Sequence, residues 1–114
     1  MNENVTIFKA LSDPNRLRIL KALQLRVLCV CELRELLNLA NSTVSQHLKI
    51  LKETGFIIEE KDGKWVNYKI NPSPSDERIS TVLSSLDFWM KDENTIERDK
   101  SKVSELDRIK LCGI

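Results

Sequence analysis

The sequence lacks the features that mark membrane, secreted and disulfide-rich proteins. It has no run of roughly 18 apolar residues, and its first residues do not combine a basic region with an apolar stretch and a small-residue cleavage site. We therefore expect a cytoplasmic protein without a membrane partner. Three cysteines are too few, and odd in number, for a disulfide framework, so we expect reduced thiols that can bind a metal.

The low content of aromatic residues, histidine and net charge excludes several classes of function. Aromatic residues make up 5% of the chain and show no repeated aromatic and basic pattern of the kind that stacks single-stranded bases, so any nucleic-acid partner is expected to be a duplex. The single histidine, the lack of a glycine-rich phosphate loop and the lack of paired carboxylates predict that the protein is not an enzyme. The formal charge of +1 means that a DNA-binding surface must be local.

What the sequence does contain begins with two predicted helices. The first spans about residues 4–11 and stops at Ser12, and the second begins with Asp13 as its N-cap and Pro14 at the first helical position. In the second helix, the expected core residues are Leu17, Leu20 and Leu23, and the residues expected to point largely outward are Arg16, Arg18 and Lys21.

Residues 31–55 predict a helix-turn-helix. The segment CELRELLNL is followed by a polar break at residues 40–42 and then by STVSQHLKILKETG, in which Gly55 supplies a left-handed C-terminal cap. The expected buried positions are Leu33, Leu36, Leu37, Val44, Leu48 and Leu51. The polar positions on the other side of the second helix are Ser42, Ser45, Gln46, Lys49 and Glu53.

The pattern then changes from helical to extended and predicts a β-hairpin wing. Asp62 and Gly63 separate FIIEEK from KWVNYKI, and this pair between two β-prone runs is typical of a type I′ turn, in which both central residues have positive φ. Alternation in the second strand predicts one buried face, with Val66, Tyr68 and Ile70, and one wet face, with Trp65, Asn67 and Lys69. A helix-turn-helix followed by a hairpin is a winged helix.

The C-terminal part predicts a dimerisation helix and a charged tail. Apolar residues recur at helical spacing after Pro74, at Ile79, Val82, Leu83, Leu86, Trp89 and Met90. Since the domain already has a core, we expect this helix to pack on a second copy. Residues 1–91 are thus predicted to be a winged helix-turn-helix domain, mainly α, that dimerises through its N- and C-terminal helices. In the tail, residues 92–114, Asn94 to Glu97 has a capping-box pattern, typical of a last helix or of a segment ordered only in the dimer.

The segments SDPNRLRIL, LCVCELRELL, STVSQHLKILKETG and DGKWVNYKI, in this order and spacing, closely resemble the ArsR/SmtB family of bacterial metal-sensing repressors. The resemblance covers roughly residues 4–90, and LCVCEL directly ahead of TVSQHLKIL makes it specific. It implies a homodimeric winged-helix repressor that occupies operator DNA without inducer and releases it when metal binds. The thiolate box resembles that of the arsenite- and cadmium-responsive branches.

The sequence departs from each of these branches. Arg34 stands where arsenite sensors with this box often have a third cysteine, and the N-terminal cysteines of the cadmium and lead branch are absent from this sequence. His47 is the only histidine, which makes the branch that senses zinc through His and Asp a poor match. The box matches, but the family's ligand set is incomplete.

We predict that the metal ligands are Cys29, Cys31 and, from either subunit, Cys112. Soft thiolates favour thiophilic ions, and the expected inducer is As(III), with Sb(III), Cd(II) or Pb(II) as alternatives; DNA binding is expected to need no cofactor. Positions two apart on a helix point to roughly opposite sides, so Cys29 and Cys31 can hold one ion only if the helix start is irregular or unwinds on binding. An ion that bridges the two cysteines would then distort this helix and misplace the recognition helix.

Other interpretations of the cysteines stay open. Cys29 or Cys31 could be a small buried hydrophobic residue, and Cys112 could be an incidental thiol near the terminus. The same cysteines could instead form a redox or persulfide switch on a repressor of the same fold.

The predicted DNA-binding residues lie on the recognition helix and at the wing tip: Ser42, Thr43, Ser45, Gln46, His47, Lys49, Lys61 and Lys64. Gln46 suits adenine, whose N6 and N7 it can engage together. Ser42 and Lys49 are placed for phosphate, and Lys61 and Lys64 for an adjacent backbone or minor groove. His47 lies near the apolar edge of the helix, so it could pack instead of contacting bases.

Two other classes of protein compete with this interpretation. A metal buffer or chaperone would use the thiolates but would need no wing and would not protect an operator. A winged-helix protein whose helices contact other proteins would not bind duplex DNA.

Overall fold

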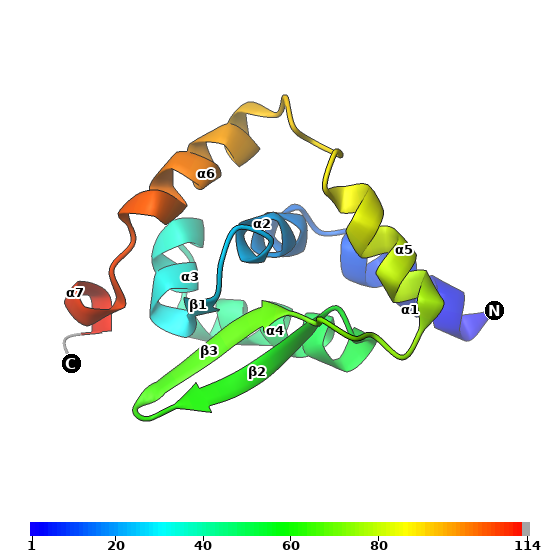
Figure 1. Cartoon of the computed structure of the whole chain (residues 1–114), viewed down its shortest axis with the longest axis horizontal. Coiled ribbons are helices and arrows are strands. Elements are labelled where there is room, and N and C mark those ends of the chain that lie inside the picture. Colours follow the sequence, from blue (N-terminus) through cyan, green and yellow to red (C-terminus); the bar gives the residue numbers. More distant parts are fainter. Residues whose placement is uncertain (113–114) are drawn as a thin grey trace.

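The computed structural model describes the backbone of residues 1–112 and the side chains of residues 1–111 (Figure 1). In chain order the elements are α1 (Asn2–Leu11), α2 (Pro14–Leu23), β1 (Leu28–Cys29), α3 (Val30–Leu37), α4 (Asn41–Thr54), β2 (Ile57–Asp62), β3 (Trp65–Ile70), α5 (Glu77–Leu86), α6 (Asn94–Glu105) and α7 (Arg108–Cys112). The predicted winged helix-turn-helix is confirmed: α3 and α4 form the helix-turn-helix, and the β2–β3 hairpin is the wing.

Local signals in the sequence set the start of α2 and the end of α4. The Asp13 carboxylate accepts the backbone N–H groups of Asn15 (2.7 Å) and Arg16 (3.3 Å), with Pro14 at the first helical position of α2. Gly55 ends α4 at φ 98°, a value that residues with a Cβ rarely adopt. Both predicted helix boundaries are therefore confirmed.

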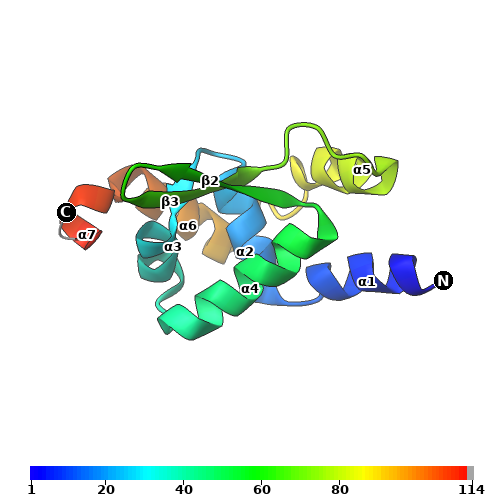
Figure 2. The same cartoon turned by 90° about the horizontal axis from the view of Figure 1, so that it is seen from below.

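The core lies where α2, α3 and α4 meet the base of the wing. Figure 2 shows α4 running below α2 and α3, with the hairpin alongside. Its fully buried side chains include Ile19, Leu20, Leu28, Leu33, Val44, Leu48, Leu51 and Phe56. The predicted buried stripes of the helix-turn-helix all belong to this core, because each repeats at the spacing that keeps it on one side of its helix.

The wing and β1 together form a three-stranded antiparallel sheet in the order β1-β3-β2. Asp62 pairs with Trp65, so the two central residues of the turn are Gly63 and Lys64. Of these only Gly63, at φ 61°, has a positive φ, as in a type II′ turn. The predicted type I′ turn is therefore wrong in register and type, although the hairpin is where the sequence predicts it.

The predicted alternation of buried and wet residues in β3 is also wrong. All six residues of β3 are half-buried. The face expected to be wet is covered by Arg108 of α7, whose guanidinium carbon lies 4.4 Å from the ring centroid of Trp65. The C-terminal segment thus shields the face of the wing that the sequence assigns to solvent.

The helix expected to reach Trp89 and Met90 ends earlier, at Leu86. The cause lies in α2, whose side chains take the last carbonyls of α5: Lys21 Nζ donates to the Leu86 carbonyl (2.6 Å) and Gln24 Nε2 to the Leu83 carbonyl (3.0 Å). A continued helix would have used these carbonyls for its own N–H groups. Met90, at φ 65°, then turns the chain.

Residues 94–112 form two helices, α6 and α7, and we call them the C-terminal arm. The Asn94 capping box predicted from the sequence is wrong, because Asn94 is the first helical residue and the N-cap is Glu93, without a side-chain cap bond. The arm packs on the body of the domain: Asp99 of α6 pairs with Arg18 of α2 (2.8 Å), and Lys102 Nζ donates to the Glu35 carbonyl of α3 (2.8 Å). Arg18 is therefore engaged by the arm and does not point outward as expected.

Among the described residues, no helix has the length and apolar character that crossing a lipid bilayer requires.

Candidate DNA interface and thiol site

The outer side of α4 carries the polar residues that the sequence assigns to DNA. Opposite the buried residues of α4, five side chains are exposed together: Ser42, Thr43, Ser45, Gln46 and Lys49. The helix begins after Ala40, and no side chain caps its N-terminus. Backbone N–H groups at an uncapped helix N-terminus can meet a phosphate, and the short side chains beside them permit a close approach.

The wing tip carries the two predicted lysines. Lys61 lies on β2 and Lys64 in the turn, and both are exposed. Each is adjacent in sequence to a residue that Arg108 contacts: Asp62, whose Oδ2 lies 3.4 Å from Arg108 Nη2, and Trp65. Both lysines thus lie beside the part of the hairpin that the C-terminal arm contacts.

His47 differs from the other predicted DNA-binding residues because it is buried, with 9% of its surface exposed. Its Nδ1 lies 3.2 Å from Arg16 Nη1, so Nδ1 is the acceptor. Arg16 also donates to the carbonyls of Ala10 (2.8 Å) and Lys9 (2.9 Å), which belong to α1. This network joins α1, α2 and α4, and it gives His47 a packing role instead of a place on the DNA-facing side.

Cys29 occupies a junction between the wing and the helix-turn-helix. It is the last residue of β1, where it pairs with Asn67 of β3, and it is the N-cap of α3. Its backbone is extended, at φ −89° and ψ 170°, so Cys29 lies outside the helical turn that contains Cys31. The helix start is therefore irregular between the two cysteines, which is one of the two conditions under which the sequence allows both sulfurs to reach one ion.

The Cys29 thiol takes part in a capping box. Its sulfur accepts the backbone N–H of Glu32, while Glu32 Oε1 accepts the backbone N–H of Cys29 at 3.0 Å. Only 2% of Cys29 is exposed. Burial raises the pKa of the thiol, the hydrogen bond from the Glu32 backbone opposes this, and the Glu32 charge adds to it. An ion that binds this sulfur must displace a proton and break the cap.

Glu32 is a functional candidate that the sequence interpretation missed. It is buried, and its Oε2 accepts from Arg26 Nη2 at 2.8 Å. The same nitrogen lies 3.2 Å from the carbonyls of both Val103 and Leu106, at the end of α6. Glu32 stands three positions after the N-cap, where the partner in a capping box occurs, but cysteine is an unusual N-cap residue, so the sequence alone does not indicate this pair.

The other two predicted ligands lie on neighbouring helices. Cys31 is half-buried in the first turn of α3, and Cys112 is the last residue of α7, which packs against α3. Cys31 is disulfide-bonded, so the expectation of reduced thiols is wrong at this position, whereas Cys29 is a free thiol. The Cys112 side chain falls outside the described residues. Among the side chains that are described, no three His, Cys, Asp or Glu residues form a cluster that could hold a metal.

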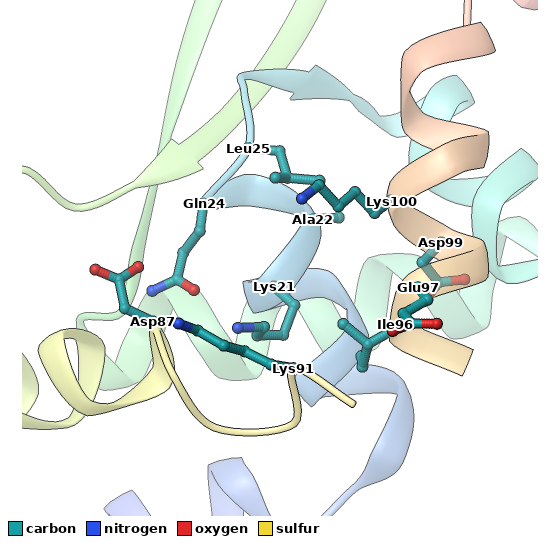
Figure 3. Close-up of a pocket in the computed structure, with 10 residues that line it drawn as sticks. All are labelled: Lys21, Ala22, Gln24, Leu25, Asp87, Lys91, Ile96, Glu97, Asp99 and Lys100. Carbon is teal, nitrogen blue, oxygen red and sulfur yellow. The ribbon is translucent and has the colours of Figure 1, made fainter. Parts of the chain in front are cut away.

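A separate hollow of about 430 Å³ lies between α2, α6 and the segment that joins α5 to α6 (Figure 3). Its charged and polar lining includes Lys21, Gln24, Asp87, Lys91, Asp99 and Lys100, and none of these is a predicted site residue. Burial lowers the pKa of Lys21; Asp87 opposes this shift, and the charges of Lys91 and Lys100 add to it. The hollow marks the seam along which α6 is attached to α2.

Comparison with known proteins agrees with this geometry. Residues 13–59 match the model of the family described as bacterial regulatory protein, arsR family. The chain is 41% identical over 69 residues to an arsenical resistance operon repressor of Escherichia coli, covering 60% of this chain and 59% of that protein. It is 38% identical over 90 residues to an arsenic resistance transcriptional regulator of Pseudomonas putida, covering 75% and 78% respectively.

Cadmium regulators are related as well. The cadmium resistance regulatory protein CadC of Listeria innocua is 45% identical over 64 residues, covering 55% of this chain and 54% of that protein. Among solved structures, HlyU of Vibrio cholerae superposes with a TM-score of 0.62 at 29% identity, covering 75% of this chain and 88% of that one.

Proposed function

The chain belongs to the ArsR family of bacterial regulatory proteins, and we propose that it is a homodimeric repressor that a thiophilic ion, As(III) in the first place, releases from its operator. One observation carries the proposal: Cys29 is at once a strand residue of the wing sheet and the N-cap of α3. A ligand on its sulfur acts on both parts of the DNA-binding unit.

The proposed DNA contacts are made by the exposed polar side chains of α4 and of the wing tip. Gln46 is placed to read adenine in the major groove, flanked by Thr43 and Ser45, while Ser42 and Lys49 neutralise or bind phosphate. Lys61 and Lys64 reach the neighbouring backbone or minor groove from the wing. His47 acts indirectly, because its contact with Arg16 sets how α4 lies against α1.

The dimer is supported by an apolar surface that the single chain leaves open. A groove between α1 and the end of α5 is lined by Phe8, Leu11, Ser12, Leu17, Val82, Phe88, Trp89 and Met90. Of these, Phe8 is 71% exposed and Phe88 63%. Large aromatic residues this exposed are typical of an interface, and a second copy of the same surface would cover them across a two-fold axis.

Replacing Phe8 by Ala is expected to weaken this dimer. An aromatic anchor at the centre of an interface contributes about 1 kcal/mol or more, so the dimer dissociation constant should rise at least about fivefold. Sedimentation at several protein concentrations measures the change. Val5→Ala is the control, since Val5 is also exposed on α1 but does not line the groove. Equal dissociation constants for both variants would contradict this interface.

The thiol site is proposed to lie within one chain. Because α7 packs against α3, the backbone of Cys112 returns to the helix that carries Cys31, and the third ligand can come from the same subunit. Cys31 is disulfide-bonded, so it can serve as a ligand only after a thiol reductant has cleaved that bond with two electrons. Ion binding at Cys29 requires its sulfur to give up the Glu32 N–H. The cap of α3 then opens, and α4 moves relative to the wing. Sb(III), Cd(II) and Pb(II) are alternative thiophilic inducers.

The raised pKa of Cys29 predicts a pH dependence that separates two inducers. The thiol stays protonated at neutral pH, so each Cd(II) that binds it releases a proton, and affinity should rise about tenfold per pH unit for each thiol so deprotonated. Arsenous acid instead loses its hydroxyls as water with the thiol protons, so its affinity should be flat between roughly pH 6 and 8. Metal titrations at constant ionic strength measure both slopes. A flat Cd(II) profile would show that Cys29 is not a ligand.

The function itself is tested on the complex with the DNA upstream of its own gene. Arsenite titrated into this complex should release the protein as the ligand-to-metal absorption of thiolate sulfur appears. Affinity without inducer should fall steeply with salt and should be lower for a scrambled duplex. Tight ion binding without an effect on DNA would instead indicate a metal buffer, and equal affinity for both duplexes would contradict a sequence-specific repressor.

A further inference from the structure

We propose that the C-terminal arm is a positioning element for the wing, and that Arg108 is the residue through which it acts. Arg108 is the first residue of α7, and its guanidinium lies against the hairpin. Nothing in the helix-turn-helix requires such a contact. The contact between Arg108 and the hairpin gives the arm a part in DNA binding that the sequence does not indicate.

Arg108 contacts both strands of the hairpin at its tip. Its guanidinium carbon stacks 4.4 Å from the ring centroid of Trp65, the first residue of β3, and Nη1 donates to Asn67 Oδ1 at 3.3 Å. Nη2 donates to Asp62 Oδ2, at the end of β2, at 3.4 Å. Asp62 and Trp65 are the pair that closes the turn. One side chain thereby restrains the turn from both sides.

These contacts determine how the wing meets DNA. Lys61 and Lys64 flank the restrained pair, and the hairpin tip itself lies outside the buried core. The Arg108 charge also neutralises the Asp62 carboxylate, which lies between the two lysines in sequence. Without Arg108, the tip would be free to move, and a bare carboxylate would face the phosphates that the lysines attract.

The middle of the arm, just ahead of α7, is held at the thiol site. Arg26 Nη2 contacts the Val103 and Leu106 carbonyls of α6 as well as the Glu32 carboxylate that caps Cys29. Asn67, which Arg108 holds, is the residue paired with Cys29 across the sheet. The arm therefore joins the cap of Cys29 to the wing tip. This regulatory role rests on the proposed function, whereas the positioning of the wing does not.

The test compares Arg108→Gln with Lys110→Gln, which removes the same charge from the same helix at an exposed position. Both proteins are labelled with 5-fluorotryptophan, and the Trp65 and Trp89 resonances are assigned with a Trp89→Phe variant. Arg108→Gln should shift the Trp65 resonance and leave Trp89 in place, because only Trp65 lies under the guanidinium. It should also weaken operator binding about three- to fivefold, while Lys110→Gln leaves Trp65 unchanged.

A double-mutant cycle shows whether Arg108 acts through the wing. Lys64→Gln should reduce operator affinity clearly in the otherwise unmodified protein and much less in the Arg108→Gln background, because a misplaced wing no longer delivers the lysine. Independent effects of the two substitutions, or an unshifted Trp65 resonance in Arg108→Gln, would overturn the proposal. The Arg108 and Lys64 substitutions could prove coupled in a protein that arsenite does not release from DNA. That result would support this inference and would reject arsenite as the inducer in the proposed function.

Discussion

Operator complexes of Cys29→Ser and Cys31→Ser are expected to persist at arsenite concentrations that release the unmodified protein. A two-site coupling of about 1 to 3 kcal/mol corresponds to a change in DNA affinity of roughly 5- to 150-fold, and each variant should lose most of it. Serine is a suitable replacement at position 29 because it is a preferred N-cap and can accept the Glu32 N–H in place of the sulfur. The variant should therefore keep the cap and its affinity for DNA in the absence of arsenite.

The measurement is fluorescence anisotropy of labelled operator during arsenite and Cd(II) titrations, with affinity at zero ion as the control for folding. Cys112→Ser tests whether Cys112 is the third ligand. If it responds like Cys29→Ser, the third thiol belongs to the site; if it responds like the unmodified protein, two thiolates suffice for the inducer. Release of both the Cys29 and Cys31 variants at unchanged arsenite concentrations would reject the thiol switch itself.

The parts of the fold that depend on local patterns were predictable from the sequence. Leu48 and Leu51 fall on one side of α4 and Gln46 on the other because helical periodicity alone separates them. Asp13 with Pro14, and Gly55, mark helix ends for reasons that lie within a few residues. The helix-turn-helix and the wing follow from such signals, and the comparisons confirm the family that they resemble.

The arm and the end of α5 were not predictable in the same way, because their causes lie far away in the sequence. Lys21 and Gln24 end α5 from a helix about 60 residues earlier. Arg108 partly covers a strand face that the local sequence pattern assigns to solvent. Periodicity describes the local secondary structure that a segment favours. These features depend instead on hydrogen bonds to polar groups far away in the sequence.

The thiol site lies between these two cases. Its position ahead of the recognition helix is visible in the sequence, but its geometry is not. The extended backbone of Cys29 and the inward position of Glu32 arise because the strand of the wing sheet and the start of α3 share one residue. A helical wheel places Cys29 and Cys31 on opposite sides only because it ignores this change of backbone conformation.

Replacing Asp99 by Ala is expected to cause the largest loss of stability that the arm can produce. Asp99 accepts two hydrogen bonds from Arg18, at 2.8 and 3.0 Å, and the side chains are 10% and 22% exposed respectively. Removing one partner of a buried ion pair costs about 3 to 5 kcal/mol because the other charge stays buried; the partial exposure of Arg18 reduces our expectation to about 2 to 3 kcal/mol.

Urea unfolding followed by circular dichroism measures this loss, with Asp92→Ala as the control because Asp92 is an exposed acidic residue just ahead of α6. If the cost is that of a stranded guanidinium, replacing both partners, as in Arg18→Met with Asp99→Leu, should recover most of the stability. If the Asp99–Arg18 pair stabilises the protein only through the packing of α6, the double variant should not recover stability. If Asp99→Ala and Asp92→Ala unfold at the same urea concentration, the Asp99–Arg18 pair does not stabilise the attachment of α6 to α2.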